Sequence, residues 1–271
     1  MQNGKQGRVL IVAGSDSGGG AGIQADIKAV TVMGGFAMTA VTAITVQNTL
    51  GVHGIHEVPA DIVAAQMRAV LDDIGTDAVK TGMLHSAAIV EAVAEELSRL
   101  DELPPLVADP VMVAKGGASL LENAAVAALR EVLIPLSALV TPNVPEAEIL
   151  TGREIVDVEG QKAAADALLG LGAEAVLVKG GHLPGDLIFD VLATQETIQI
   201  FSSPRIGTRH THGTGCTLAS AIAALLAQGV EITAAVAAAR DYVHEAIRTA
   251  PGFGKGHGPL NFLAVLDDED A

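Results

Sequence analysis

The sequence has few aromatic residues and a single cysteine. Aromatic residues make up 2% of its 271 residues, with no tryptophan and one tyrosine, Tyr242. Apolar residues still make up 49%, so a sizeable core can be buried, and it must be built mainly from Ala, Val, Leu and Ile. Because Cys216 is the only cysteine, an intrachain disulfide and a metal site made of several cysteines are both excluded.

Basic residues and long apolar runs are also scarce. Sixteen Lys and Arg stand against 32 Asp and Glu, which gives a formal net charge of −16. Such an acidic surface repels phosphate backbones and anionic lipids, so neither nucleic acid nor a membrane is expected as a partner. No run approaches the ~18 apolar residues of a membrane span, and the start MQNGKQGRVLIVAG lacks a signal-peptide pattern. We expect a cytoplasmic protein that binds phosphates with backbone amides and a few lysines.

Two common glycine-rich nucleotide motifs are missing as well. The chain contains no G-x-x-x-x-G-K-[ST], so it is not a P-loop enzyme by motif. The segment SDSGGGAG, residues 15–22, does not have the G-x-G-x-x-G spacing of dinucleotide-binding folds. Its three adjacent glycines nevertheless remove the side chains from one wall and allow close contact with a ligand.

What is present is a regular alternation of short apolar runs and amphipathic stretches. The expected strands are 8–14, 36–47, 51–59, 77–82, 106–110, 138–142 and 175–181, followed by a hairpin-like pair at 187–193 and 197–203. The expected helices are 21–35, 60–73, 87–97 capped by Ser86, 123–133, 144–150, 158–172, 217–227 and 232–248. Repeated strand–helix units predict a mostly parallel sheet with helices on both faces. We expect one domain, residues 1–271, with an acidic tail, 266–271, that frays.

Polar residues and glycines follow six of the expected strands. Parallel strands place ligands at their carboxyl ends, so a site is expected where these residues meet. Any single strand end is explained as well by ordinary turn composition, but six such ends together favour a site. The six ends are 14–16, 45–47, 80–83, 109–111, 141–143 and 179–181.

The segment HTHGTGCTLASAIAALLAQG carries the most specific chemistry. A strongly helical stretch begins just after Gly213, Thr214, Gly215 and Cys216. Free amides and the helix dipole favour an anion there, so the loop is a candidate cradle for a phosphoryl group. The same field would favour the thiolate of Cys216, which could accept the proton of an attacking hydroxyl. The alternative is a buried, inert cysteine.

Several motifs in order along the chain resemble one family. They are VAGSDSGGGAGIQADIKA, TAVTAITVQNT, VKTGML, ADPVMVAKGG, TPNVPEAEIL, VKGGH, HTHGTGCTLASAIAA and GKGHGPLNF. From about Arg8 to Phe262 they resemble the hydroxymethylpyrimidine/phosphomethylpyrimidine kinases of thiamine biosynthesis, within the ribokinase-like superfamily. The resemblance implies a three-layer α/β/α fold around a sheet of about eight mostly parallel strands, usually as a homodimer. It also implies two transfers from ATP with Mg²⁺, first to the hydroxymethyl group of the aminopyrimidine and then to the resulting monophosphate.

The resemblance also assigns roles to individual residues. Cys216 takes the place of the aspartate base of related sugar kinases, with an anion hole formed by Gly213, Thr214 and Gly215. The substrate-binding residues that it implies are Gln47, Asp26, Gly14, Met83 and Val111. Lys179, Asp109 and Asn143 are implied near the ATP phosphates, and Glu146 near Mg²⁺ through water.

Simpler readings stand beside these assignments. Asp26 could be an exposed helix carboxylate, Met83 and Val111 ordinary core, and Glu146 a residue that complements a helix start. His212 is interpreted as satisfying a backbone group and is left out of the site. The glycines at 254, 256 and 258 suggest that residues 252–258 close as a lid. The rival functions are a pyridoxine or pyridoxal kinase and, in a different class, a non-catalytic pyrimidine-binding sensor.

Overall fold

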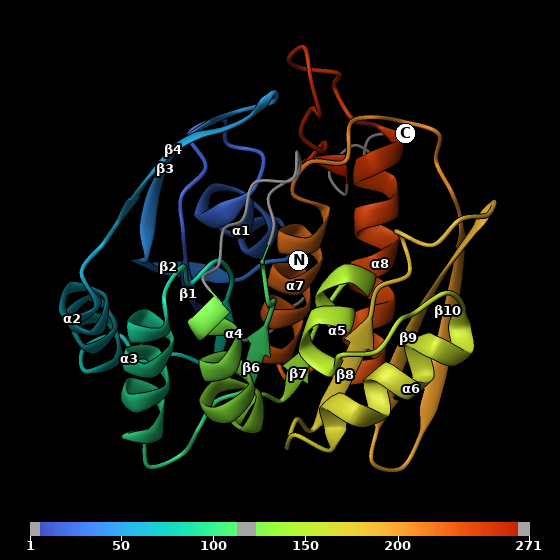
Figure 1. Ribbon diagram of the computed structural model, residues 1–271. Helices are drawn as coiled ribbons and strands as arrows, with labels where there is room; N and C mark the ends of the chain where they lie inside the picture. Colours follow the sequence, from blue (N-terminus) through green and yellow to red (C-terminus); the bar gives the residue numbers. More distant parts are fainter. Residues whose placement is uncertain (1–5, 113–122, 265–271) are drawn as a thin grey trace.

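The computed structural model describes residues 6–112 and 123–264 (Figure 1). The tail that was expected to fray, 266–271, and residues 113–117 of the motif ADPVMVAKGG lie outside the described residues. Within the described residues, an eight-stranded sheet and a separate two-stranded ribbon carry the fold. Every helix in this part of the chain is too short or too polar to cross a membrane.

The main sheet has the strand order β10-β9-β8-β7-β6-β5-β1-β2. Neighbours from β2 to β8 pair in parallel, whereas β9 is antiparallel to both β8 and β10. The strands are β1 (Arg8–Ala13), β2 (Phe36–Val41), β5 (Ala78–Thr81), β6 (Leu106–Ala108), β7 (Leu139–Val140), β8 (Ala175–Val178), β9 (Leu187–Thr194) and β10 (Ile198–Pro204). The predicted mostly parallel sheet and its terminal hairpin are confirmed.

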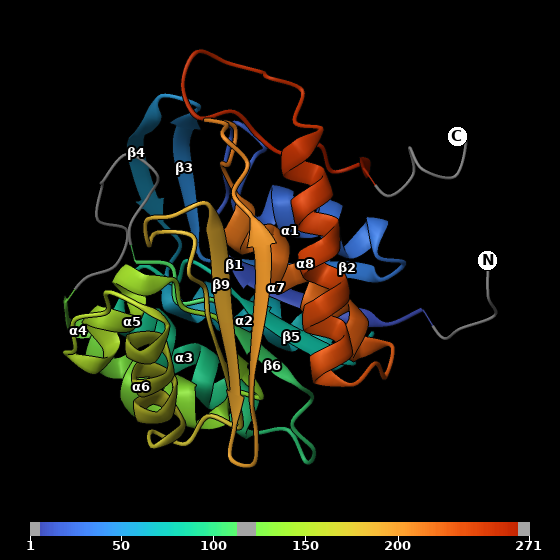
Figure 2. The same ribbon diagram turned by 90° about the vertical axis from the view of Figure 1, so that its right-hand side faces the viewer.

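Helices cover both faces of this sheet, which Figure 2 shows nearly edge-on. One face carries α2 (Ala60–Leu71), α3 (Ala87–Ser98), α4 (Asn123–Ala128), α5 (Val144–Thr151) and α6 (Val158–Leu169). The other carries α1 (Gly22–Val32), α7 (Thr214–Ala227) and α8 (Ile232–Arg248). Helix α4 continues into a π-helical turn, Leu129–Leu133, and a 3-10 turn, Ile134–Leu136. The predicted three-layer α/β/α architecture is confirmed.

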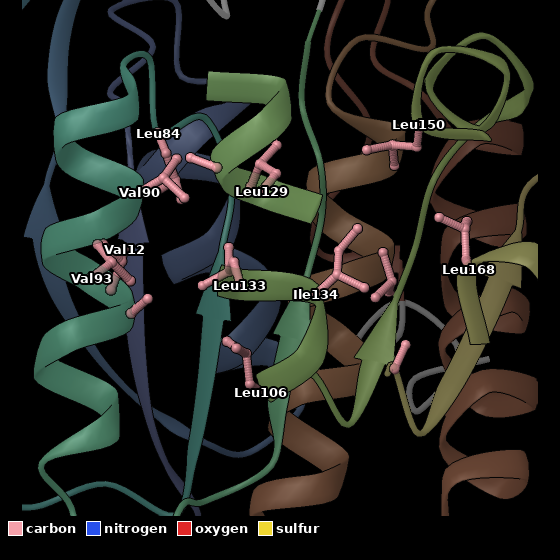
Figure 3. Close-up of a cluster of buried hydrophobic side chains, with 14 of the residues drawn as sticks. Val12, Leu84, Val90, Val93, Leu106, Leu129, Leu133, Ile134, Leu150 and Leu168 are labelled. Carbon is pink, nitrogen blue, oxygen red and sulfur yellow. The ribbon is translucent and has the colours of Figure 1, made fainter. Parts of the chain in front are cut away.

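The core lies in two layers because successive side chains of a strand point to opposite faces of the sheet. In β1, Leu10 and Val12 join the core under α2–α6, and Val9 and Ile11 join the core under α1, α7 and α8. All four side chains are fully buried. Figure 3 shows Val12 beside side chains of α3, with residues of the α4 region farther along the same layer. A continuous apolar strand is therefore buried on both sides, as expected of a parallel sheet.

The run 36–47, predicted as one strand, divides into two. Strand β2 stays in the main sheet, and β3 (Ala43–Asn48) pairs with β4 (Gly51–Glu57) in an antiparallel ribbon. The break is at Thr42, whose amide donates to the carbonyl of Ala13 at 3.1 Å and whose hydroxyl donates to that of Met83 at 2.6 Å. These bonds hold the point where the chain leaves the sheet. The ribbon projects beyond the sheet's edge in Figure 1.

The start of α7 and the predicted cap of α3 differ from the expectation. Helix α7 begins at Thr214 rather than Thr217, because Gly213 serves as its N-cap with φ +82°. A Cβ at this position would lie 1.7 Å from the carbonyl oxygen of Gly20, so only glycine fits. Ser86 occupies the N-cap position of α3 but makes no side-chain cap. Its hydroxyl instead donates to the carboxylate of Glu57.

Candidate active site

A cavity of about 1020 Å³ opens at the carboxyl ends of the parallel strands. All six polar strand ends contribute to its lining, each from a different part of the chain. One residue from each end is Gly14, Gln47, Lys80, Asp109, Asn143 and Lys179. The cavity is at the upper limit of the range usual for a single small ligand, so it has room for two adjacent ligands.

The first turn of α7 forms the floor of this cavity. Thr214, Gly215 and Cys216 line it, together with the N-cap residue Gly213. They are helical residues rather than a loop before the helix, so their amides lie where the helix dipole is positive. No acidic residue lies in this turn. The arrangement suits an anion better than a free loop would.

The thiol of Cys216 is half-buried, and its environment does not favour the thiolate. Burial raises the pKa of Cys216 to about 12, and the carboxylates of Asp26 and Asp109 add to the rise. Lys80 opposes this increase in pKa. The pKa of Cys216 is therefore raised, opposite to the lowering expected from the sequence, because desolvation exceeds the attraction of Lys80.

Lys179 and Asp109 form an ion pair over the start of α7. Lys179 Nζ donates to Asp109 Oδ1 at 3.0 Å, and Thr141 donates to the same oxygen at 3.3 Å. Burial alone would lower the pKa of Lys179, but Asp109 and then Glu146 reverse this and raise it. A Cβ on Gly215 would lie 3.1 Å from Lys179 Nζ. The glycine thus lets the ammonium approach the amides of the helix.

Asn143 and Glu146 form a complete capping box at the start of α5. The side chain of Asn143 accepts from the amide of Glu146 at 3.0 Å, and the Glu146 carboxylate accepts from the amide of Asn143 at 2.8 Å. Glu146 thus complements the start of α5 and also lines the cavity, so its helix-start reading does not exclude the predicted position near Mg²⁺. Burial raises the pKa of Glu146 to about 7, against the pull of Lys179, and Asp109 raises it further.

A polar chain links Gln47 to a buried aspartate. His212 Nε2 lies 2.8 Å from Asp16 Oδ2 and 3.2 Å from the amide of Gln47. Because His212 Nε2 donates to Asp16, it cannot also accept from the Gln47 nitrogen that faces it. Thr45 Oγ1 lies 3.2 Å from the Gln47 oxygen, but it already donates to the carbonyl of Ser15 at 2.8 Å. Donors and acceptors therefore match better if the side-chain amide of Gln47 is turned by 180°, so that its oxygen faces His212 and its nitrogen faces Thr45.

Apolar residues form one wall beside Gln47. Met83 and Val111 line the cavity and pack with Ala43, Val52 and Ile55 of the ribbon. Met83 is 8% exposed, so it belongs both to a small core cluster and to the cavity wall. The two readings of these residues, core and wall, are thus not exclusive.

Gly14 also lines the cavity, at the end of β1. A Cβ on this residue would lie 2.4 Å from Met83 Cε. The missing side chain therefore lets the methionine reach its position. The missing side chain of Gly14 therefore shapes this strand end.

Asp26 is not part of the cavity lining. It is fully buried behind the pocket, where both of its oxygens accept from Lys80 Nζ at 2.9 and 3.0 Å. Ser220 Oγ donates to the same carboxylate at 2.7 Å. The placement of Asp26 as a residue flanking the substrate therefore needs correction, because Lys80 lies in the lining instead. Asp26 is not an exposed helix carboxylate either.

Proteins of similar sequence identify the family of the chain. The family model described as phosphomethylpyrimidine kinase matches residues 16–261. The chain belongs to this family. A hydroxymethylpyrimidine/phosphomethylpyrimidine kinase of Bacillus subtilis is 49% identical over 258 residues, which cover 95% of each chain. The thiamine biosynthesis bifunctional protein ThiED of Geobacter sulfurreducens is 53% identical over 263 residues, which are 97% of this chain but 54% of that protein.

Solved structures of this phosphomethylpyrimidine kinase family and its neighbours share the fold. The phosphomethylpyrimidine kinase of Clostridium difficile is 42% identical with a TM-score of 0.79, covering 89% of this chain and 100% of that one. The ADP complex of a Bacillus subtilis pyridoxal kinase is 36% identical with a TM-score of 0.89, covering 97% and 99%. The ribokinase-like fold expected from the sequence motifs is therefore confirmed.

Three residues of this family member's cavity were not assigned by sequence reasoning. The His212 ring contacts the side chains of Gln47 and Asp16, so the interpretation that it satisfies a backbone group is wrong. Asp16 also accepts from three amides of the glycine-rich segment, those of residues 18, 20 and 21. Lys80 could have been identified from the sequence, because a lysine within the apolar strand 77–82 requires a buried partner of opposite charge.

Proposed function

We propose that the chain transfers the γ-phosphoryl group of ATP to the hydroxymethyl group of 4-amino-5-hydroxymethyl-2-methylpyrimidine, and then phosphorylates the monophosphate again, as a step of thiamine biosynthesis. The observation that carries the proposal is one cavity that joins a flat, amide-bearing wall at Gln47 to a phosphate cradle at the start of α7. The names of the relatives support the same substrate class.

The substrate side suits an aminopyrimidine. Gln47 can donate to a ring nitrogen and accept from the neighbouring exocyclic amine, and Met83 and Val111 offer apolar contact to the ring. With the ring in this position, we expect the hydroxymethyl group to point toward Cys216, which lines the same cavity. The pocket thereby orients the nucleophile, which is the main requirement of phosphoryl transfer.

In the transfer, the hydroxymethyl oxygen forms a bond to the γ-phosphorus while the bond from that phosphorus to the leaving ADP oxygen breaks. The amides of the first turn of α7 and the ammonium of Lys179 stabilise the charge on the transferred group. The hydroxyl proton passes to the sulfur of Cys216, which must be a thiolate to accept it. In a loose transition state the proton leaves late, so the base need not be strong.

The residues that would hold Mg²⁺ are Asp109 and Glu146, through water. Among the described residues no group of three or more His, Cys, Asp or Glu could hold a metal. Two carboxylates beside a phosphate site nevertheless fit Mg²⁺, which keeps several waters and binds the phosphates of its nucleotide. When bound, Mg²⁺ supplies positive charge beside the phosphates. Because Asp109 raises the pKa of Cys216, neutralising Asp109 lowers it.

A substrate panel tests the activity. Purified protein with Mg-ATP should release ADP when given the hydroxymethylpyrimidine, and again when given its monophosphate. The solved pyridoxal kinases, which match with TM-scores of about 0.89, make pyridoxal the second candidate substrate. Turnover on pyridoxal alone would favour that reading, and ADP release with none of the three would favour a non-catalytic sensor.

Substitution of Cys216 tests its role as the base. Cys216→Ala should lower kcat by about two orders of magnitude or more, because general-base catalysis contributes that much. Pyrimidine binding, measured by calorimetry, should stay within about threefold of the original, since the residue does not touch the Gln47 wall. Full activity in this variant would show that another group accepts the proton.

We further propose that the chain forms a homodimer through the outer face of the β3–β4 ribbon. Ile44, Val46 and Leu50 are 53%, 63% and 63% exposed there, whereas Thr45 and Gln47 face the cavity. Contiguous exposed apolar side chains on a projecting ribbon favour burial against another copy. Light scattering should give a dimer mass that falls to the monomer mass in Val46→Glu. A monomer in both proteins would refute the proposal.

A further inference from the structure

The ion pair of Lys80 and Asp26 acts electrostatically on Cys216, and Lys80 lines the same cavity as Cys216. The pair has no part in the transfer described above. Both side chains are fully buried, and Lys80 Nζ donates to both oxygens of Asp26 at 2.9 and 3.0 Å. Ser220, four residues after Cys216 on the same face of α7, donates to Asp26 at 2.7 Å. The pair is therefore held by α1, β5 and α7 at once.

Lys80 lies between Asp26 and the cavity. It bonds to Asp26 on the side away from the cavity, and Lys80 is itself part of the cavity lining beside Cys216. A Cβ on Gly82 would lie 2.8 Å from Lys80 Nζ, so the strand end has the one residue that leaves space for the ammonium. A buried charge of this kind is costly unless it is paired, and its position in the lining of the same cavity as Cys216 points to a role in the site.

The pair is ionised in the structure. Burial alone would lower the pKa of Lys80, but Asp26 reverses the effect and raises it. Burial raises the pKa of Asp26, against the pull of Lys80. The raised pKa of Lys80 favours a charged pair, whereas the raised pKa of Asp26 favours a protonated, neutral carboxyl. The geometry decides for the charged pair, because Lys80 reaches both oxygens of Asp26 and Ser220 adds a further donor, which uses acceptor capacity that a protonated carboxyl would lose.

We propose that this pair controls the proton on Cys216, with Lys80 favouring the thiolate and Asp26 limiting that effect. Lys80 and Asp26 are thus positioning residues that act through the thiol. The inference deepens the proposed role of Cys216 as proton acceptor. Asp109, after β6, and Lys179, after β8, also interact electrostatically with Cys216. They form a second ion pair, in which Asp109 raises the pKa of Cys216 and the positive charge of Lys179 acts in the opposite direction.

The direction of each effect follows from the sign of the charge. Lys80 lowers the pKa of Cys216 and Asp26 raises it, and Lys80 has the larger influence of the two. Removing the charge of Asp26 should therefore make the thiol more acidic. Removing both charges should make it less acidic than in the unaltered protein, because the larger influence is lost.

Alkylation of the thiol measures this without any kinase activity. Cys216 is the only cysteine, so the rate of iodoacetamide addition, followed by intact mass, reports on that sulfur alone. Thiolate is the reactive form, so the rate at a fixed pH below the pKa changes about tenfold for each unit by which the pKa moves. Rates should be measured from about pH 6 to pH 10 in each protein.

Three variants give opposed expectations. Asp26→Asn keeps the shape and an acceptor for Lys80, and it should raise the alkylation rate at about pH 8 by threefold or more. Asp26→Asn with Lys80→Met removes both charges and should bring the rate below that of the unaltered protein. Asp77→Asn alters another ion pair, with Arg8 at the opposite ends of the strands, and should leave the pH profile unchanged.

The outcomes separate this inference from the proposed base. Identical alkylation profiles in folded Asp26→Asn, in the double variant and in the unaltered protein would overturn the inference. If Asp26→Asn does not fold, the neutral double variant alone decides, since a rate equal to or above the original would contradict it. A shifted alkylation profile with an unmoved pH profile of kcat would support control by the pair and refute Cys216 as the base.

Discussion

The ammonium of Lys179 lies 3.0 Å from the carboxylate of Asp109, over the amino terminus of α7. Both side chains lie close to the backbone of Gly215, because a Cβ at that residue would be 3.1 Å from Lys179 Nζ and 3.8 Å from Asp109 Oδ2. A positive side chain, a negative side chain and the positive end of a helix thus meet at one glycine. This relationship makes the glycine, rather than either charge, the most informative residue to change.

Gly215→Ala should separate stability from activity. Gly215 lies in the first turn of α7 without a positive φ, so alanine is compatible with the backbone and should stabilise the helix by up to about 1 kcal/mol. The added methyl group displaces the end of Lys179, so kcat should fall about ten- to a hundredfold. Tm and kcat measured on one preparation check this. Gly170→Ala, at the end of α6 and far from the cavity, is the control that should leave kcat unchanged.

His212→Phe tests the chain that orients Gln47. Phenylalanine keeps a ring in the cavity but cannot donate to Asp16 or bond to the Gln47 amide. Loss of one such hydrogen bond should raise the KM for the pyrimidine about tenfold, with the KM for ATP nearly unchanged. Steady-state kinetics with each substrate varied in turn provide the measurement. A large fall in kcat at an unchanged KM would instead mean that His212 acts on the transfer itself.

The sequence indicates the site as far as local patterns extend. Apolar strands ending in Gly, Asp, Asn and Lys, combined with the rule that parallel sheets bind ligands at strand ends, were enough to predict which ends would meet. Gly213–Cys216 could be placed because a strongly helical stretch follows them. These predictions needed only the neighbours of each residue along the chain.

What the sequence could not indicate depends on contacts between distant segments. Asp16 and His212 are 196 positions apart, and neither has a neighbour in sequence that reveals the other. The pKa of Cys216 is set by burial and by charges from α1, from β5 and from the loop after β6, so the helix start alone predicted the wrong direction. Asp26 was misplaced for the same reason, since its partners Lys80 and Ser220 lie 54 and 194 positions away.

Glu146 should make stability depend on pH near neutrality. Its pKa is raised from 4.5 to about 7 in the fold. Between these values the folded protein holds a proton that the unfolded chain does not, so this contribution is full below about pH 4.5 and is lost as pH rises through about 7. Glu146→Gln, which resembles the protonated form, should therefore gain relative stability over that window, by up to about 3 kcal/mol.

Thermal unfolding in buffer without Mg²⁺ measures this difference. Each kcal/mol corresponds to a Tm change of about 2–4 °C for a chain of this size, so the Tm gap between Glu146→Gln and the unaltered protein should widen by several degrees from about pH 5 to pH 8. Glu91→Gln, at an exposed position of α3, should show no such widening. A gap that stays constant with pH would mean that Glu146 is ionised in the fold throughout.

The glycine-rich segment 252–258 is docked on the turn of the β3–β4 ribbon, and the two lie side by side in Figure 1. His257 donates its amide to the carbonyl of Thr49 at 2.8 Å, and Gly256 donates to the Thr49 hydroxyl at 3.3 Å. A Cβ on Gly256 would lie 2.0 Å from that carbonyl oxygen, so Gly256→Ala should release the segment. The fold beneath does not depend on this contact, and Tm should change little.

If the segment closes over bound substrate, its release should raise KM about three- to tenfold, because ordering it then costs binding energy. Trypsin should also cleave after Lys255 faster than in the unaltered protein, since an undocked loop is more accessible. Thr49→Ser keeps both acceptors and should behave like the original in both assays. Faster cleavage with an unchanged KM would mean that the segment docks on the ribbon without retaining substrate, and the lid hypothesis would then be wrong.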